Sequence, residues 1–317
     1  MMTTSSISTA APSMLATSAP GTVPFNPLDH PILFTEPRWM AVSSWREHVP
    51  FALLAVDLLR PERIVELGSH YGVSLCAFCQ AVEYFHLHTK CYAVDTWQGD
   101  PQAGFYGEEV LATLRAHHDP LYGHFSTLLQ GLFDNAVGKF EDGSIDLLHI
   151  DGLHTYEAVK HDFETWLPKM SRRGVVLFHD TAVEDPDFGV KAFWAELTAR
   201  HPGFEFHHGS GLGVLAVGPD QPPALECLTQ ASPSEADMIR RLFAQLGSSI
   251  SAQDDLKNLR ENLSQEAAKS AALHEEVHLL KQRVEFLDNT LNYMRTSVFW
   301  KMRDKWVRFK GAAPLSR

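Results

Sequence analysis

The sequence predicts an α/β protein: a doubly wound, seven-stranded sheet, mostly parallel with an antiparallel edge, followed by a C-terminal helical coiled coil. Three observations lead to this prediction. Between residues 63 and 217, short apolar runs alternate with amphipathic segments, which is typical of a parallel sheet covered by helices on both faces. The last two runs have no helix between them, which indicates an antiparallel edge. From residue 236, Gly and Pro almost vanish and apolar residues recur with helical spacing.

Short apolar runs, several of which end on an acid or a glycine turn, predict the strands. They lie at 63–67, 91–95, 124–129, 145–150, 174–178, 204–207 and 213–217. Amphipathic segments between them predict helices at 73–87, 107–118, 135–140, 156–169 and 188–200. The chain therefore divides into an α/β domain (40–218), a Pro-rich linker (219–235), a coiled coil (236–295) and a basic aromatic tail (296–317).

Composition excludes several classes of protein. The chain has 317 residues, enough for one or two domains, and 44% hydrophobic residues, as a folded protein needs. A net charge of -12 argues against general nucleic-acid binding. Four cysteines are too few for a disulfide scaffold and fit a reducing cytoplasm. Residues 1–28 carry no charged side chain, so a signal peptide is not expected, and 1–25 are interpreted as a flexible tail.

Acidic and imidazole side chains gather at the predicted strand ends. Glu66 ends the first strand, Asp95 the second and Asp151 follows the fourth, while His179 and Asp180 end the fifth. Ligands of doubly wound sheets bind beyond the carboxyl ends of the strands, where the strand order reverses. Acids are poor strand residues, so their collection at one edge predicts a binding site there.

The loop after the first strand, ELGSHYGVS (66–74), predicts the cofactor. Its Gly-x-x-x-Gly spacing, from Gly68 to Gly72, is neither the dinucleotide fingerprint nor a phosphate loop, and no Lys follows to hold a phosphate. S-adenosylmethionine (SAM), which has an adenosine but no pyrophosphate, fits better. Glu66 would attract its amino group, Ser69 lies in the loop, and Asp95 would accept hydrogen bonds from the ribose hydroxyls. The alternative is an ordinary turn with a capping Ser.

Several blocks then resemble class I SAM-dependent methyltransferases, which have a Rossmann-like fold, and in particular a bacterial family associated with surface-glycan gene clusters. The blocks are VELGSHYGVS (65–74), YAVDTWQGDPQAGFYGEEV (92–110), GSIDLLHIDGLHTYEAVKHDFETWLPKM (143–170), GVVLFHDT (174–181), DFGVKAFWAEL (187–197) and GLGVLAVG (211–218). The resemblance spans about residues 60–218 and implies that Glu66, Gly68, Gly72 and Asp95 bind SAM. Trp97 would flank the adenine or act as a core or lid aromatic.

The catalytic prediction rests on Asp151, His154, His179 and Asp180. Two carboxylates with imidazoles suit a divalent ion such as Mg²⁺ or Mn²⁺, predicted here on Asp151, His179 and Asp180. The pattern is similar to metal-dependent sugar O-methyltransferases of macrolide biosynthesis, which implies that His154 is the general base. His179 stands where that pattern has an acid, which leaves the metal open. Alternatively, His154 caps the next helix and His179 packs internally. The pair Cys76 and Cys79 is expected to pack in the core.

Two features of the C-terminal arm predict partners. Twelve positions from Leu256 to Met294 follow a 3-4 spacing and ten of them are apolar, which favours a homodimeric coiled coil over packing back on the domain. Residues 296–317 hold six Lys/Arg and one Asp among aromatic side chains. This composition suits peripheral contact with an anionic membrane, or docking on an acidic protein surface.

The sequence thus predicts a cytoplasmic enzyme, with possible contact to the membrane's inner face, that uses SAM to methylate a sugar hydroxyl of a glycan or glycolipid precursor. A nicotinamide oxidoreductase is disfavoured because the dinucleotide fingerprint is missing. The remaining alternative is a non-catalytic SAM-binding coiled-coil scaffold in a glycan-assembly complex.

Overall fold

The computed structural model describes residues 25–102 and 104–311. The chain divides after Asp254 into two units, which are taken separately below. Almost all of the predicted tail over 1–25 lies outside the described residues.

The first unit is built on a seven-stranded sheet with the strand order β5-β2-β1-β6-β7-β9-β8. The first five of these are parallel, and β9 and β8 run antiparallel at one edge, which confirms the predicted sheet. Their bounds are β1 Arg63–Leu67, β2 Lys90–Asp95, β5 Ser126–Gln130, β6 Ile145–Ile150, β7 Met170–His179, β8 Gly203–Phe206 and β9 Leu212–Ala216. The order reverses at β1: the next strands, β2 and β5, lie on one side of β1, and β6 then lies on its other side. The crevice between β1 and β6 is therefore the expected ligand position.

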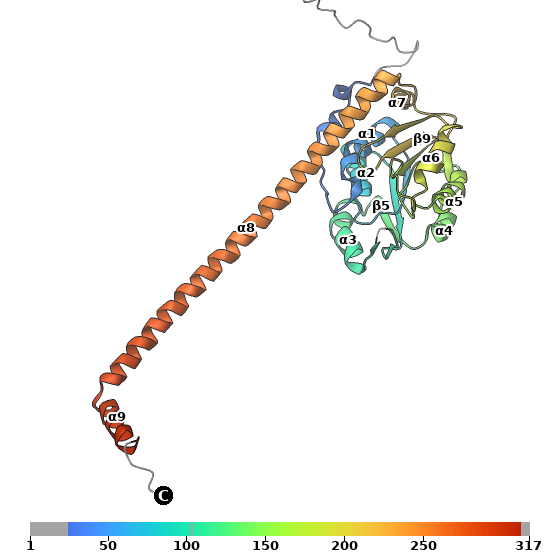
Figure 1. The fold of residues 1–317 in the computed structure, drawn as a ribbon. Coiled ribbons are helices and arrows are strands. Elements are labelled where there is room, and N and C mark those ends of the chain that lie inside the picture. Colours follow the sequence, from blue (N-terminus) through green and yellow to red (C-terminus); the bar gives the residue numbers. More distant parts are fainter. Residues whose placement is uncertain (1–24, 103, 312–317) are drawn as a thin grey trace, which may run out of the picture. The chain divides into compact units, whose positions relative to one another are not determined.

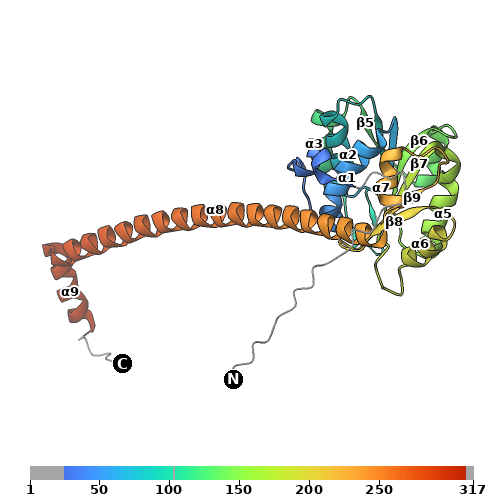
Figure 2. The same cartoon turned by 90° about the horizontal axis from the view of Figure 1, so that it is seen from above.

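Helices cover both faces of this sheet (Figures 1 and 2). One face carries α1 (Val49–Leu59), α2 (Val73–Tyr84) and α3 (Glu108–Tyr122), and the other carries α4 (Phe133–Ala136), α5 (Tyr156–Trp166) and α6 (Val190–Thr198). The strands are buried on both sides, and side chains alternate between the two cores: in β7, Val175 and Leu177 join one core, whereas Val176 and Phe178 join the other.

Helix α1 is a feature that the pattern of the sequence did not indicate. Ten of its eleven residues are buried, so it has no polar face and no amphipathic period. Other helices agree with prediction to within a few residues, and Cys76 and Cys79 pack in the core as expected. A two-stranded ribbon, β3 (Gly99–Asp100) and β4 (Gly104–Phe105), interrupts the loop after β2.

The boundary of the first unit lies later than the predicted linker. The segment 219–235 contains the short helices η6 (Pro223–Leu225) and α7 (Glu226–Thr229), whose Leu225 and Leu228 are buried. Helix α8 then runs over Pro233–Thr296, and its residues Ala236, Ile239 and Phe243 pack in the core. The first turns of the predicted coiled coil therefore belong to the α/β unit.

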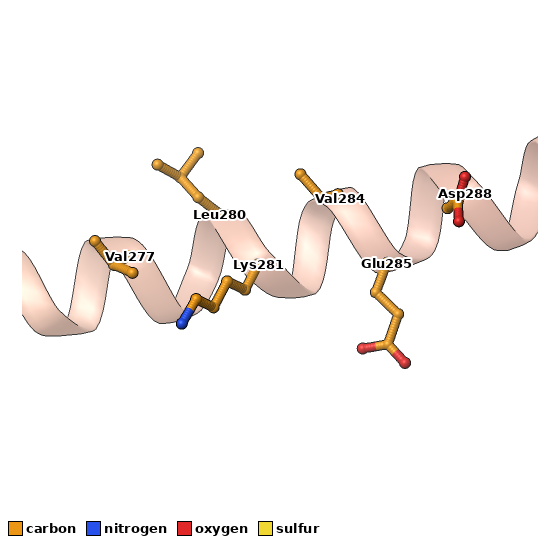
Figure 3. Close-up of a pocket in the computed structure, with 6 residues that line it drawn as sticks. All are labelled: Val277, Leu280, Lys281, Val284, Glu285 and Asp288. Carbon is orange, nitrogen blue, oxygen red and sulfur yellow. The ribbon is translucent and has the colours of Figure 1, made fainter.

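The second unit comprises α8 from Asp255 onward and α9 (Val298–Gly311). The apolar positions of the predicted heptad, from Leu256 to Met294, are exposed in the single chain. Leu280 and Val284 rise from the same side of α8, and Lys281 and Glu285 lie next to them along one edge of the same surface groove (Figure 3). Among the described helices, none is long and apolar enough to cross a membrane.

Candidate functional site

A cavity of about 890 Å³ lies at the point where the strand order reverses. Its walls come from the loops after β1, β2, β6 and β7 and from residues 42–46. The loops after β1 and β6 touch closely: the Asp151 amide donates to Leu67 O, and a Cβ on Gly68 would lie 1.9 Å from Asp151 O. Gly68 also has a φ of +84°, so only glycine suits this position.

The carboxylate of Asp95 holds the glycine-bearing loop in place through hydrogen bonds. Its Oδ2 accepts hydrogen bonds from the amides of Ser69 and His70 at 2.8 and 2.9 Å, and its Oδ1 accepts one from the amide of Trp97 at 2.7 Å. Gly68, Ser69 and Asp95 all line the cavity. A carboxylate offers about four acceptor positions, so Asp95 retains capacity for a ligand hydroxyl.

Glu66 lies beneath this loop rather than on the cavity wall. Its side chain is fully buried; Oε1 accepts from the Ser69 hydroxyl at 2.6 Å, and Oε2 lies 2.9 Å from His149 Nδ1. The Trp45 indole, which can only donate, lies 3.0 Å from His149 Nε2. Nε2 is therefore the acceptor, and Nδ1–H donates to Glu66. The carboxylate predicted to attract the SAM amino group is thus occupied by internal partners.

Trp97 and Gly72 also take supporting positions. Trp97 is only 2% exposed, and its indole donates to His70 O at 2.9 Å, so of the two alternatives it is the core aromatic. Gly72 has a φ of +70° and packs against Leu114, where a Cβ would lie 2.5 Å from Leu114 Cδ1. Neither residue is among those that line the cavity.

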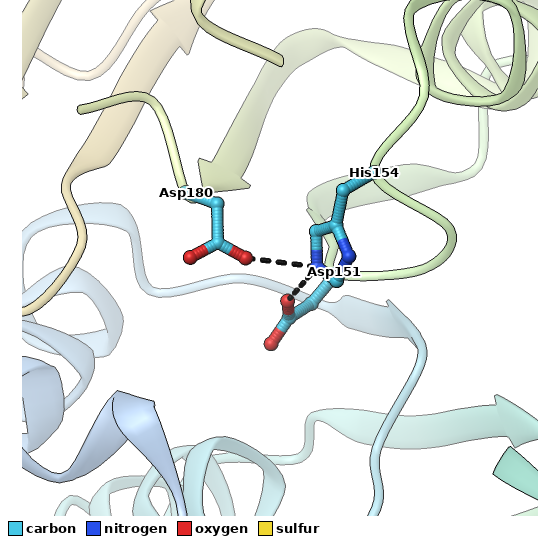
Figure 4. Close-up of side chains that lie close together, drawn as sticks. All are labelled: Asp151, His154 and Asp180. Atoms are coloured by element: carbon cyan, nitrogen blue, oxygen red, sulfur yellow. Dashed lines mark ion pairs between the residues drawn. The ribbon is translucent and has the colours of Figure 1, made fainter. Parts of the chain in front are cut away.

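Asp151, His154 and Asp180 meet on the cavity wall, although they come from two different loops (Figure 4). His154 Nε2 lies 2.8 Å from Asp180 Oδ2 and 3.6 Å from Asp151 Oδ1. One ligand atom from each residue can be chosen so that all three lie within 4.8 Å of one another, which would suit a metal ion. Asp180 has a φ of +62°, a left-handed conformation that is uncommon for residues with a side chain, although Asp adopts it more readily than most.

His179 lies behind this group. Its side chain is 1% exposed and does not line the cavity; Nδ1 is 3.2 Å from both Asp151 Oδ1 and Asp180 Oδ2, and Nε2 is 3.3 Å from Gly209 O. The structure therefore places His154, not the predicted His179, in the group that could hold a metal. As the last residue of β7, His179 packs near Trp45 and His48.

The two carboxylates control the protonation of both imidazoles. Burial by itself would lower the pKa of His154, but hydrogen bonds to Asp151 and Asp180 raise it to about 9. Burial likewise opposes the charged form of His179, yet Asp151 and Asp180 raise its pKa to about 10. Burial would raise the pKa of Asp151, but His179 and His154 hold it well below its usual value. In the ligand-free chain both imidazoles are therefore protonated on both nitrogens at neutral pH and carry a positive charge.

Two residues that sequence reasoning did not single out position His154. Gln102, on the turn between β3 and β4, presents Oε1 to the amide of His154 at 2.9 Å and to its Nδ1 at 3.3 Å. Gln102 Nε2 donates to Asp187 O, which fixes the orientation of the amide. Phe188 stacks on the imidazole with ring centroids 4.7 Å apart. Nδ1–H thus points at Gln102, and Nε2 faces the carboxylates.

Comparison with known families matches one part of the chain to a methyltransferase domain. Residues 65–181 match the model of a family described as a methyltransferase domain. The matched segment begins in β1 and ends just after Asp180, so it contains Gly68, Asp95, Asp151 and His154. Every residue of the Asp151–His154–Asp180 group therefore lies inside the matched region.

A curated relative covers more of the chain. The protein called uncharacterized protein y4gI, from Sinorhizobium fredii, is 52% identical over 192 residues, which are 61% of this chain and 20% of that protein. The chain thus spans about a fifth of the length of this relative.

Several solved structures of methyltransferases resemble part of the chain at low identity and low TM-score. A putative caffeoyl-CoA O-methyltransferase from Staphylococcus aureus is 13% identical with a TM-score of 0.43, over 54% of this chain and 82% of that one. The O-methyltransferase TomG from Streptomyces achromogenes, in complex with SAM, is 16% identical with a TM-score of 0.42, over 56% and 82%. At these scores the likeness adds no argument about cofactor or substrate.

Proposed function

We propose that this protein transfers the methyl group of SAM to a hydroxyl oxygen, and that the acceptor is a sugar hydroxyl of a glycan or glycolipid precursor. The observation that carries the proposal is the position of Asp151, His154 and Asp180 on the wall of the same cavity as Gly68 and Asp95. A base and two carboxylates thus face the space next to a loop suited to an adenosine cofactor.

The walls of the cavity fit SAM in size and charge. Its volume, about 890 Å³, is in the range of cofactor sites. Gly68 lets the backbone come close to a ligand, and Asp95 retains acceptor capacity for ribose hydroxyls. Asp95 adds a negative charge to the cavity wall, which complements a sulfonium cation, whereas Asp151 and Asp180 are each paired with an imidazole. When bound, SAM supplies an electrophilic methyl group.

His154 is proposed to remove the proton from the acceptor hydroxyl. Methylation of an alcohol releases one proton, and Nε2 of a neutral His154 is the available acceptor, because Nδ1–H points at Gln102. In the ligand-free chain the neighbouring carboxylates keep this nitrogen protonated, since the pKa of His154 is raised to about 9. His154 must therefore lose that proton before it can act.

The group Asp151, His154 and Asp180 also fits a divalent cation, with two carboxylates and one imidazole. An imidazole ligand favours Mn²⁺ over Mg²⁺, and such an ion would acidify and orient a hydroxyl of the acceptor. The same Nε2 atom cannot both bind the ion and accept the proton. If a metal binds Nε2, His154 is therefore not the base; if no metal binds there, His154 is free to act as the base.

The lining of the cavity supports a sugar acceptor. Asp100 and Asp185 line it together with Tyr106 and Phe188. Carboxylates that bond hydroxyls, combined with aromatic rings that cover C–H surfaces, provide the two kinds of contact a carbohydrate offers.

Calorimetry with SAM and a turnover assay with a glycan extract test the proposal. His154→Ala and Asp151→Ala should abolish formation of S-adenosylhomocysteine and change SAM affinity little. His161→Ala, an exposed imidazole on α5 paired with Asp134, is the matched control and should keep activity. Binding of SAM without turnover on any hydroxyl acceptor would favour the scaffold alternative. Loss of activity with EDTA and its recovery with Mn²⁺ would show that the reaction needs a metal.

We also propose that α8 pairs with a second copy of the chain through its heptad positions. Leu273, Leu280 and Leu287 are about half exposed or more in the single chain, and a solitary helix of this kind lacks burial to stabilise it. Leu280→Asp with Leu287→Asp should convert a dimer to a monomer in sedimentation equilibrium. The matched pair Gln282→Asp and Asn289→Asp, on the side of α8 opposite the heptad positions, should leave the dimer intact. A monomeric native chain contradicts this proposal.

A further inference from the structure

We propose that α9 binds in the surface of an anionic lipid membrane, lying parallel to it. This inference is independent of the proposed methyl transfer. It rests on two observations: the helix carries a continuous apolar stripe that no residue within 25–102 or 104–311 covers, and basic residues flank that stripe on both sides.

The apolar stripe consists of five residues on one side of α9. At about 100° per residue, one arc of the helix collects Val298, Phe299, Met302, Trp306 and Phe309. All five are exposed, from 57% for Trp306 to 87% for Phe299. Large exposed apolar side chains in a contiguous patch mark a binding surface rather than ordinary protein surface.

Basic side chains border this stripe on each side. Lys301, Lys305 and Arg308 follow one edge, and Arg303 and Lys310 follow the other. Asp304 is the single acid of the helix and lies on the side away from the stripe, where it pairs with Arg303. Long basic side chains next to an apolar stripe can extend to headgroups while the stripe enters the acyl region.

A membrane accounts for both flanks better than a protein partner does. Anionic headgroups form a continuous plane, so a helix lying in it meets negative charge along its two long edges at once. A second copy of α9 would cover the stripe but would place its own five basic residues against those of the first. Trp and Phe among the stripe residues are also the side chains that favour the interface between water and lipid.

Vesicle sedimentation with the full-length protein tests this inference. We expect binding to vesicles of phosphatidylcholine with about 30% phosphatidylglycerol, and much weaker binding to phosphatidylcholine alone. Met302→Gln with Phe309→Gln, within the stripe, should lower the partition coefficient by at least about tenfold. Trp300→Gln with Val307→Gln, on the opposite side, is the matched control and should change it by less than about twofold.

A charge variant gives an independent measurement. Lys301→Gln, Lys305→Gln and Arg308→Gln together should weaken binding to anionic vesicles by about a hundredfold. Raising the salt from about 0.1 M to about 0.5 M should also weaken binding of the native protein to anionic vesicles. Far-UV circular dichroism shows whether each variant remains folded.

Three results would overturn the inference. The first is that the native protein stays in the supernatant with anionic vesicles, which leaves an acidic protein as the partner of the stripe. The second is that the control pair loses binding as strongly as the stripe pair. The third is that the stripe pair lowers the mass of the protein in sedimentation equilibrium without lipid, which would make the stripe an interface between copies.

Discussion

The Nε2 atom of His154 lies 2.8 Å from Oδ2 of Asp180, so the proposed base and the positive-φ residue after β7 form one ion pair. This pair joins the loop after β6 to the loop after β7 on the wall of the cavity. Because the partner is an anion, it raises the affinity of the imidazole for a proton.

Methyl transfer should increase with pH through the titration of His154. The pKa of His154 is raised to about 9, so below this pH most molecules hold a protonated imidazole that cannot accept a proton. Asp180→Asn removes one of the two anions and should move the rising limb of kcat/KM to lower pH. Asp134→Asn, at the exposed pair with His161, is the control. A limb that stays in place in Asp180→Asn rules out this origin of the pH dependence.

Gln102→Ala should lower kcat about tenfold, because the imidazole loses the acceptor that fixes its Nδ1–H. The affinity for SAM should change little, since Gln102 contacts His154 and not the glycine loop. Gln98→Ala, an exposed glutamine in the same segment, should be neutral. Rates are measured at saturating SAM. An equal effect of the two substitutions would mean that the loop, and not the contact, matters.

Glu66→Gln should leave SAM affinity unchanged. A glutamine can accept from His149 with its oxygen and donate to the Ser69 hydroxyl, so both buried contacts persist. Glu66→Ala would leave the His149 Nδ1–H without an acceptor and should cost about 1–3 kcal/mol in the free energy of unfolding. Calorimetry and urea unfolding measure the two effects. A tenfold loss of SAM affinity in Glu66→Gln would restore the role predicted from the sequence.

Gly68→Ala should destabilise the fold by several kcal/mol, roughly 3 or more, and abolish SAM binding. Its Cβ would lie 1.9 Å from Asp151 O, and its φ of +84° disfavours any side chain. Gly138→Ala is the matched control, because a Cβ there meets no atom within 4 Å. Thermal unfolding compares the two. Wild-type stability in Gly68→Ala would show that the loops after β1 and β6 can separate at no cost.

Asp162→Asn should stabilise the protein above pH 6. Burial raises the pKa of Asp162 from 3.8 to about 6, so between these values the folded state binds more protons than the unfolded state. The free energy of unfolding therefore falls as pH rises through this window and stays lower above it. The substitution should recover about 1–3 kcal/mol at neutral pH. Glu164→Gln, exposed on the same helix, serves as control, and unfolding at pH 4 and 7 measures the difference.

The order of strands and helices could be predicted because it depends on local pattern. Runs such as RIVEL and IDLLHI are too short and too apolar for surface helices, and each is followed by an amphipathic segment, so a parallel sheet was the consistent solution. The same logic brought Asp95, Asp151 and Asp180 to one edge, where they do line one cavity. Helix α1 was not predicted because it is buried on all sides. Its sequence therefore lacks the alternation of apolar and polar residues by which a surface helix is recognised.

The roles of individual side chains at that edge could not be read from the pattern. Glu66 lies one residue before the end of β1 and Asp95 ends β2, yet Glu66 is bonded by Ser69 and His149, whereas Asp95 reaches the cavity. His154 is oriented by Gln102, 52 residues earlier in the chain. The sequence by itself determined which chemical groups gather at the switch point. Only the tertiary structure decided which of them face the cavity, because that depends on neighbours that folding brings together from distant parts of the chain.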